Sequence, residues 1–316
     1  GCAPAQKPLT DYVNPMLGTA TLWDSVDLGF KPTKRTWGAE VFPGSSLPNA
    51  MVQVSPVTKF HSGAGYQYED SVIYGFTHTN KGHWNLCHIP LLPVTGTPTP
   101  GDYCSPFSHE RESAAPGDYQ VFLDRYGVDA QLSSTLRCAF HKYTYPAGAA
   151  PAVLADLQRS NEHVRAWDIR KEGDNVFAGW QQTGEKMYFY AVANRPVTGI
   201  EPVVEGDREV RIVRFGEGDG ALELRIGFSF VSEKNARENL EAEMLGKSFA
   251  EVRSEATATW NDLLGRIRVE GGTEREKGLF YSSLYRSFLW PALRSDVNGE
   301  FTDVDGKVIN PGFRYY

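Results

Sequence analysis

The sequence predicts a mainly β fold, in which a β-sandwich is followed by helices. The chain has 316 residues with 31 glycines, 19 prolines and 12% aromatic residues, a composition that favours many turns around a large core. Before Ser232, apolar and polar residues alternate in short runs separated by polar turns. After Ser232, apolar residues recur at helical spacing. Because short alternating strands are typical of sandwiches, we expect two packed sheets first and helices afterwards.

The first 50 residues show little periodicity. Residues 1–11 resemble a solvated lead-in, and residues 20–50 contain several glycines and prolines. We expect a long loop there, and a long ordered loop in a compact domain is often functional. Packing beneath the loop is the expected use of most of its aromatic residues, which are Trp23, Phe30, Trp37 and Phe42.

The alternating runs predict the strands of the sandwich. Residues 125–127 and 171–175 are expected to be turns between strands, and residues 216–220 (GEGDG) are expected to form a hairpin turn. The predicted strands include residues 51–55, 119–123, 128–135, 137–145, 152–154, 176–178, 186–192, 209–215 and 222–230.

Three helices are expected in the last third of the chain. Thr273 and Glu276 have the spacing of a capping box, which would open the third helix, and that helix should end before Pro291. The apolar faces are predicted to be Ala236, Leu240 and Met244, then Phe249, Val252, Ala256, Trp260 and Leu263, then Leu279, Phe280, Leu284 and Phe288.

The third apolar face has little remaining sequence to cover it. We therefore expect a fragment of a longer protein, the alternative being a helix that packs back on the sheet. The predicted divisions are a sandwich over 8–231, a helical linker over 232–270 and the start of a further helical domain over 271–316.

Several classes of function find no support in the sequence. A net charge of −7 argues against a nucleic-acid partner, and no run of 18 apolar residues could span a membrane. The sequence lacks the Gly-x-Ser-x-Gly nucleophile elbow and a Gly-x-Gly-x-x-Gly dinucleotide cradle between a strand and a helix.

The four cysteines are too few for a disulfide scaffold, and their pairing cannot be read from the sequence. Cys2 follows Gly1 at the start, as expected if a bacterial lipoprotein signal is trimmed near its lipidated cysteine. We therefore expect an exported protein, a periplasmic or outer-membrane lipoprotein with Cys2 lipidated, against the alternative of an accidental cysteine.

Residues 74–88 (YGFTHTNKGHWNLCH) are the most informative stretch for function. They contain three of the seven histidines, with Trp84 and Cys87, and an apolar run follows at residues 89–94. A polar loop braced by a buried strand is a common place for binding groups. The spacing fits a zinc site poorly, because Cys87 and His88 are adjacent and would point to opposite faces of a strand. Cys87 beside an apolar run is expected to be buried and inert.

A sugar site explains this stretch better. An indole offers a flat wall to the apolar face of a sugar, and histidine and asparagine side chains offer directional hydrogen bonds. The candidate substrate-binding residues are Trp84, His83, Asn85 and His88, and no metal ligand is assigned. The structural alternative is that the histidines brace the loop and that Trp84 is a packing anchor.

Several segments, in this order, also resemble the N-terminal part of glycoside hydrolase family 92, the calcium-dependent exo-acting α-mannosidases of bacteria. The resemblance covers nearly the whole chain, although residues 38–41 and 81–84 depart from the common family pattern. The matching segments are 13–19 (VNPMLGT), 42–44 (FPG), 51–56 (MVQVSP), 65–68 (GYQY), 74–79 (YGFTHT), 107–110 (FSHE), 114–119 (AAPGDY), 227–232 (GFSFVS) and 295–299 (SDVNG).

The resemblance implies a β-sandwich joined by linker helices to an (α/α)6 barrel, of which this chain holds a truncated start. It implies hydrolysis of a mannose-containing glycan with inversion, by a carboxylic acid and a carboxylate that lie in the barrel together with most calcium ligands. The catalytic residues are therefore expected outside this chain, which alone should be inactive. By position, Trp84 resembles the tryptophan that family members acting on α-1,2 linkages place in the leaving-group subsite. A non-catalytic carbohydrate-binding sandwich and a plain structural domain are the alternatives.

Overall fold

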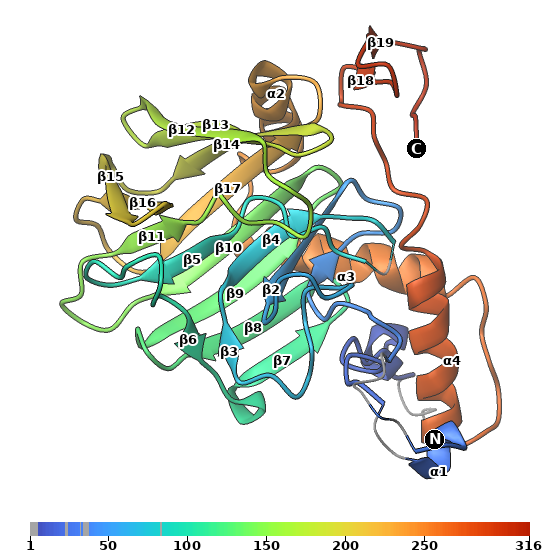
Figure 1. The fold of residues 1–316 in the computed structure, drawn as a ribbon. Coiled ribbons are helices and arrows are strands. Elements are labelled where there is room, and N and C mark those ends of the chain that lie inside the picture. Colours follow the sequence, from blue (N-terminus) through green and yellow to red (C-terminus); the bar gives the residue numbers. More distant parts are fainter. Residues whose placement is uncertain (1–5, 23–24, 32, 34–37, 83) are drawn as a thin grey trace.

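Two antiparallel sheets packed face to face make up most of the molecule, as Figure 1 shows. The structure is a computed structural model that describes residues 6–22, 25–31, 33, 38–82 and 84–316. Cys2, Trp23, Trp37 and His83, which the sequence singled out, lie outside the described residues. The mainly β prediction, with a sandwich followed by helices, is confirmed.

Within the described residues, one sheet has seven strands and the other has eight. In spatial order, the first contains β1 (Ser45–Ser46), β2 (Val52–Val57), β4 (Gly75–Thr79), β5 (Leu91–Val94), β11 (Ala152–Ala155), β16 (Arg208–Phe215) and β15 (Val197–Glu205). The second contains β12 (Ala166–Gly173), β13 (Val176–Gln182), β14 (Lys186–Ala193), β17 (Leu222–Ser229), β10 (Cys138–Thr144), β9 (Val128–Ser134), β8 (Asp118–Leu123) and β7 (Glu112–Ala115).

The remaining elements are short strand pairs and helices. β3 (Val72–Ile73) pairs with β6 (Ser105–Pro106), and β18 (Phe301–Thr302) pairs with β19 (Val308–Ile309). The helices are α1 (Ser25–Leu28), α2 (Glu233–Glu243), α3 (Phe249–Leu264) and α4 (Glu274–Ser287), with 3-10 turns η1 (Leu9–Tyr12) and η2 (His109–Arg111).

The sandwich core lies between the sheets and follows from the period of the strands. β14 alternates strictly between buried and half-exposed residues, because one face of the strand points into the core. β5 and β11 are buried along their whole length, since they lie in the middle of their sheet and are covered on both sides.

The expected hairpin at residues 216–220 is wrong. The strands that flank it, β16 and β17, lie in different sheets, so this loop crosses from one layer of the sandwich to the other. An alternating pattern fixes which residues face the core, but it does not specify the neighbouring strand.

α2 packs on the outer face of the eight-stranded sheet at a very short distance. A Cβ atom at Gly227 of β17 would lie 2.1 Å from the carbonyl oxygen of Ala236, so only glycine allows this approach. Leu240 and Met244 of the α2 segment, with Phe249 and Val252 of α3, cover Cys138 and Phe140 of β10. The sandwich and the first two long helices therefore share a second hydrophobic core.

α3 and α4 begin where the sequence indicates. Each opens with a capping box, Ser248 with Glu251 and the predicted Thr273 with Glu276. The predicted apolar face of α4 is half right. Leu284 and Phe288 pack against the cluster beneath the helix. Leu279 and Phe280 are 38% and 36% exposed, and Tyr281 and Tyr285 are buried in their place. Tyr285 packs at a tilt against Trp260, with ring centres 4.5 Å apart, and Nε1 of Trp260 donates to the carbonyl oxygen of Ser46 at 2.8 Å. Tyr281 and Tyr285 are the buried residues of α4 because their large rings reach the hydrophobic cluster around Trp260.

Candidate functional site

The turn that follows β4 carries the exposed tryptophan. The backbones of Lys81 and Trp84 exchange hydrogen bonds of 3.3 and 3.1 Å, and Gly82 between them adopts a left-handed φ of 66°. Gln53 Nε2 donates to the carbonyl oxygen of Trp84 at 2.6 Å, while the side chain of Trp84 is 44% exposed. The backbone of Trp84 is therefore fixed by hydrogen bonds, while its indole is exposed at the surface.

The turn also contacts the segment that follows α4. A Cβ atom at Gly82 would lie 3.3 Å from Cβ of Trp290, a residue that is itself 55% exposed. Asn80 Nδ2 donates to the carbonyl oxygen of Ala50 at 2.8 Å. These contacts fix the turn between the sandwich and the beginning of the C-terminal segment.

Asn85 is fully buried and braces the chain behind the indole. Its Oδ1 accepts from the backbone N–H of Cys87 at 2.7 Å, and its own N–H donates to Gly63 at 3.1 Å. Asn161 Nδ2 donates to the carbonyl oxygen of Asn85 at 2.9 Å. Cys87 and Ile89 hold left-handed φ values of 57° and 55°, and such strain persists only where hydrogen bonds determine the backbone this closely.

The thiol of Cys87 is buried, and this burial raises its pKa. The expectation of a buried, unreactive thiol therefore agrees with its surroundings. Cys87, Cys104 and Cys138 are all free thiols.

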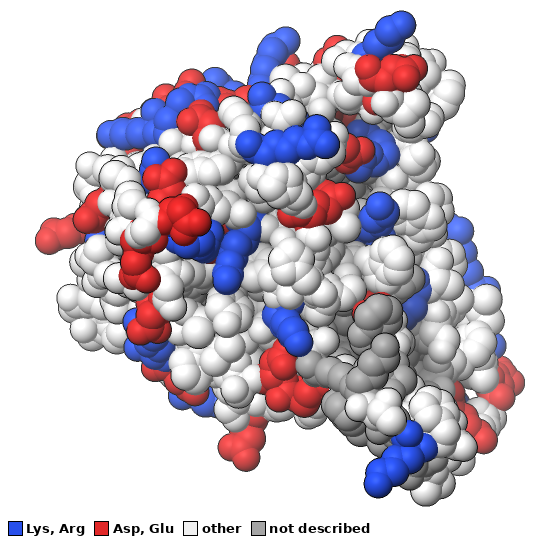
Figure 2. Space-filling view, in the orientation of Figure 1, with Lys and Arg blue, Asp and Glu red and all other residues white. Residues whose placement is uncertain are grey.

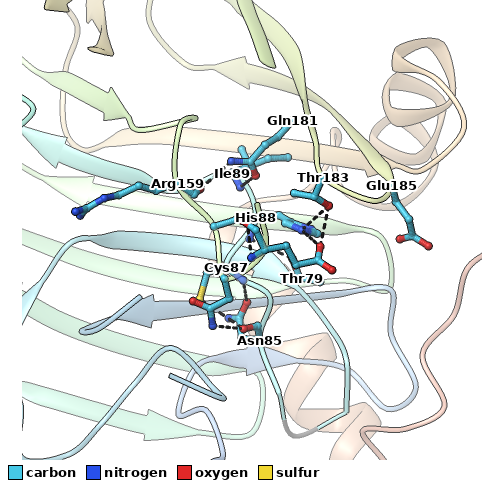
Figure 3. Close-up of polar contacts among 12 residues, drawn as sticks. Thr79, Asn85, Cys87, His88, Ile89, Arg159, Gln181, Thr183 and Glu185 are labelled. Atoms are coloured by element: carbon cyan, nitrogen blue, oxygen red, sulfur yellow. Dashed lines mark hydrogen bonds and ion pairs between the residues drawn. The ribbon is translucent and has the colours of Figure 1, made fainter. Parts of the chain in front are cut away.

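His88 holds a carboxylate that sequence reasoning missed. His88 is 2% exposed, and its Nε2 donates to Oε2 of Glu162 at 2.9 Å (Figure 3). Thr183 Oγ1 donates to the same oxygen at 2.7 Å. The hydrogen bond from His88 is the main reason that the pKa of Glu162 falls to about 2, with smaller help from Thr183 and the charge of Lys81.

Glu162 is therefore an ionised acceptor held beside the turn of Trp84. Its side chain is 37% exposed, so it can reach a ligand, whereas His88 lies beneath it. His88 and Glu162 lie 74 positions apart in the sequence, so no local pattern predicts their contact. The only available signal for Glu162 was the polar composition of residues 158–163.

The other described histidine of the stretch, His78, lies between the sheets. Its Nδ1 lies 2.9 Å from the carbonyl oxygen of Ile89 and its Nε2 lies 2.8 Å from Nε2 of His141, whose Nδ1 lies 2.6 Å from the hydroxyl of Tyr143. Because a carbonyl only accepts, His78 Nδ1 carries its proton and His141 donates to His78. Both histidines are thus neutral and fully used within the core.

These positions separate the predicted site residues. Trp84 is exposed, Asn85 and His88 are buried beneath it, and His83 lies outside the described residues. Within the described part of the chain, no three histidine, cysteine, aspartate or glutamate side chains cluster closely enough to hold a metal ion.

Two family models match the chain. The glycosyl hydrolase family 92 N-terminal domain matches residues 12–239, and the glycosyl hydrolase family 92 catalytic domain matches residues 235–316. The chain belongs to glycosyl hydrolase family 92. The resemblance found in the sequence is confirmed.

Relatives of this family-92 chain include solved and curated proteins. A family GH92 α-mannosidase from Bacteroides thetaiotaomicron is 25% identical, covers 98% of this chain and 45% of its own, and superposes with a TM-score of 0.86. A family GH92 inverting mannosidase from the same organism is 24% identical, with a TM-score of 0.81, over 98% of this chain and 44% of its own. It supports the fold alone.

A protein from Arthroderma benhamiae described as a secreted glycosidase is 24% identical over 92% of this chain and 42% of its own. The chain thus spans less than half the length of these relatives. None of the described helices is both long and apolar enough to cross a lipid bilayer.

Proposed function

We propose that the complete protein is an exo-acting, inverting α-mannosidase and that this chain supplies one wall of its leaving-group subsite. Family membership and the similarity to an α-mannosidase structure support this reading. The match of residues 235–316 to the family's catalytic domain favours a hydrolase over a separate carbohydrate-binding module. The observation that carries the proposal is the exposed indole of Trp84 on a turn with a fixed backbone.

Each residue of the site has a distinct role in this proposal. Trp84 stacks on the apolar face of the leaving-group mannose, and Glu162 accepts a hydrogen bond from one of its hydroxyls. His88 and Asn85 are positioning residues, because the first orients Glu162 and the second fixes the turn. We propose that His83 also binds the substrate and that the preferred linkage is α-1,2.

The chemical step would use residues beyond this chain. In an inverting glycosidase, one carboxylic acid protonates the leaving oxygen and a carboxylate activates water on the opposite face of the sugar. We place both, with the calcium that helps hold the mannose, in the rest of the catalytic domain. The contribution of this chain is to bind and orient the leaving group, which lowers the entropic cost of reaching the reactive geometry.

The test is Trp84→Ala in the complete protein, assayed on α-1,2-mannobiose. Removing an aromatic contact of roughly 60–100 Å² costs about 1.5–2.5 kcal/mol, which corresponds to a loss of kcat/KM of about ten- to seventy-fold. The matched control is Trp180→Ala, which removes another partly exposed tryptophan, from β13, that stacks with Lys186 at 3.8 Å. A loss of about 3–5 kcal/mol of folding stability, without a change in affinity for the folded protein, would instead make Trp84 a packing anchor.

A second assay tests the division of roles. The 316-residue chain alone should show no turnover of the same disaccharide. Turnover by this chain would show that the acid and base lie within it.

A further inference from the structure

The two sheets leave an open groove at one edge of the sandwich. β12 is the edge strand of the eight-stranded sheet, and β15 is the edge strand of the seven-stranded sheet. A groove of about 760 Å³ lies beside these edges, lined by residues of 158–169, by 207–211 and by His61. Its size is in the range of small-ligand sites.

Trp167, an aromatic residue that lines the groove, points toward the core of the sandwich. Trp167 of β12 pairs in register with Gln181, and residues paired in this way point to the same side of the sheet. Gln181 is buried, with its Nε2 donating to the carbonyl oxygens of Leu157 and Arg159 at 3.0 and 2.8 Å. Trp167 is therefore half-buried against the core, and the guanidinium of Arg211 lies 4.9 Å from the centre of its ring.

The polar groups of the groove are balanced in charge. Four arginines line it against two aspartates and two glutamates, so its formal charge, +4 and −4, is zero with the histidines neutral. Figure 2 shows the same interspersion of basic and acidic residues over this face of the molecule. A groove with many donors and acceptors, no net charge and an aromatic wall suits a neutral, hydroxyl-rich ligand better than an anion or a cation.

Hydrogen bonds within the protein already order much of this polar wall before any ligand binds. Arg208 donates to Gln158 Oε1 and to Asp156 Oδ2, both at 2.7 Å, and the side chain of Asp156 is only 1% exposed. The N–H of Glu209 donates to the same Gln158 oxygen at 2.9 Å. Binding to groups that are already ordered costs little additional side-chain entropy.

The groove adjoins the turn of Trp84. Glu162 lines the groove and also accepts the hydrogen bond from His88. Asn161 links the two regions, because it accepts from the N–H of His61 at 2.6 Å and donates to the carbonyl oxygen of Asn85. The two surfaces therefore share Glu162, and Asn161 beside it connects their backbones.

From this arrangement we infer that the groove is a distal subsite that binds a further arm of a neutral, branched mannose oligosaccharide. The inference rests on the proposed function, since Trp84 would hold the sugar next to the cleaved bond. In this proposal a disaccharide held at Trp84 does not extend to Trp167, whereas a branched glycan contacts both surfaces. The groove therefore selects for large substrates and has no effect on small ones.

The experiment compares kcat/KM of the complete protein on α-1,2-mannobiose and on a branched high-mannose oligosaccharide. Trp167→Ala should lower the value for the oligosaccharide by about five-fold and leave the disaccharide unchanged. The loss is smaller than for Trp84→Ala because Trp167 is half-buried and offers less of its ring to a sugar. Trp180→Ala is the control, because Trp180 pairs with Asp168 and lies on the opposite face of the sheet from Trp167. It should alter neither substrate.

Asp207→Ala is a second variant in case Trp167→Ala does not fold. Asp207 is exposed in the turn between β15 and β16, and its carbonyl oxygen, which accepts from Gln158, is retained. It should produce a smaller loss on the oligosaccharide alone. Equal effects on both substrates, or values equal to those of Trp180→Ala, would overturn the distal subsite. If Trp84→Ala is silent on both substrates, the proposed function fails separately from the groove.

Discussion

The buried histidine pair makes the stability of the sandwich depend on pH. His78 and His141 join β4 of one sheet to β10 of the other and are fully buried. Burial lowers the pKa of His78 to about 3 and that of His141 well below its usual value, and the neighbouring imidazole also lowers the latter. The rings of Phe76 and Phe228 pack against the pair, and among the described residues no carboxylate acts on either imidazole to neutralise a charge there.

Proton linkage determines the direction in which the stability of the sandwich changes with pH. The unfolded imidazoles take up protons near pH 6.5, whereas the folded ones do not, so acid favours the unfolded chain. The stabilisation of the folded state by the neutral histidines is complete above pH 6.5, and it is lost as the pH falls toward the pKa of the folded protein. At pH 5, protonation of the unfolded form of His78 alone lowers the free energy of unfolding by roughly 2 kcal/mol, at about 1.4 kcal/mol per pKa unit. His141 lowers it further.

Urea unfolding of the 316-residue chain at pH 7.5 and pH 5, followed by tryptophan fluorescence, measures this difference. The control is His61→Gln, because His61 is exposed and its removal should leave the pH dependence unchanged. Tyr143→Phe should lower stability at both pH values, since it removes the hydroxyl that donates to His141. Equal free energies of unfolding at the two pH values in the parent chain would refute a neutral, buried pair.

Two further predictions concern the framework of the site. Asn85→Ala should lower the free energy of unfolding by about 1–3 kcal/mol, because it leaves the buried N–H of Cys87 without its acceptor; a calorimetric melting curve measures this, and an unchanged melting temperature would contradict the bracing role. Trp260→Phe should cost a similar amount, about 1–3 kcal/mol, because the carbonyl oxygen of Ser46 loses the indole N–H; Trp180→Phe, at the surface, is the matched control.

Local features of the fold were readable from the sequence. The capping box at Thr273 and Glu276 involves neighbouring residues only, so its geometry is encoded where it occurs. The period of each run predicted strands and helices for the same reason. The face of α4 was only half predicted because tyrosines at residues 281 and 285 carry polar hydroxyls, which conceal how well their rings fill a core.

Features that depend on distant contacts were not readable. Nothing in the pattern around residues 216–220 indicates that the chain changes sheets there, because partner choice is a property of the whole sandwich. The pairing of His88 with Glu162 likewise exists only after folding. The sequence identified the turn at Trp84, and folding alone provides the carboxylate beside it.

The close approach of α2 to β17 has a practical consequence for anyone trimming the protein. Ending the chain at residue 231 would strip away Leu240, Met244, Phe249 and Val252, and the ring of Phe140 would then meet water on the back of its sheet. A bare apolar patch of this kind invites self-association. The same holds for α3, because Tyr281, Tyr285 and Leu289 cover its Trp260 and Leu264. The shortest piece worth expressing therefore continues through α4 to Leu289, well past the end of the last long strand.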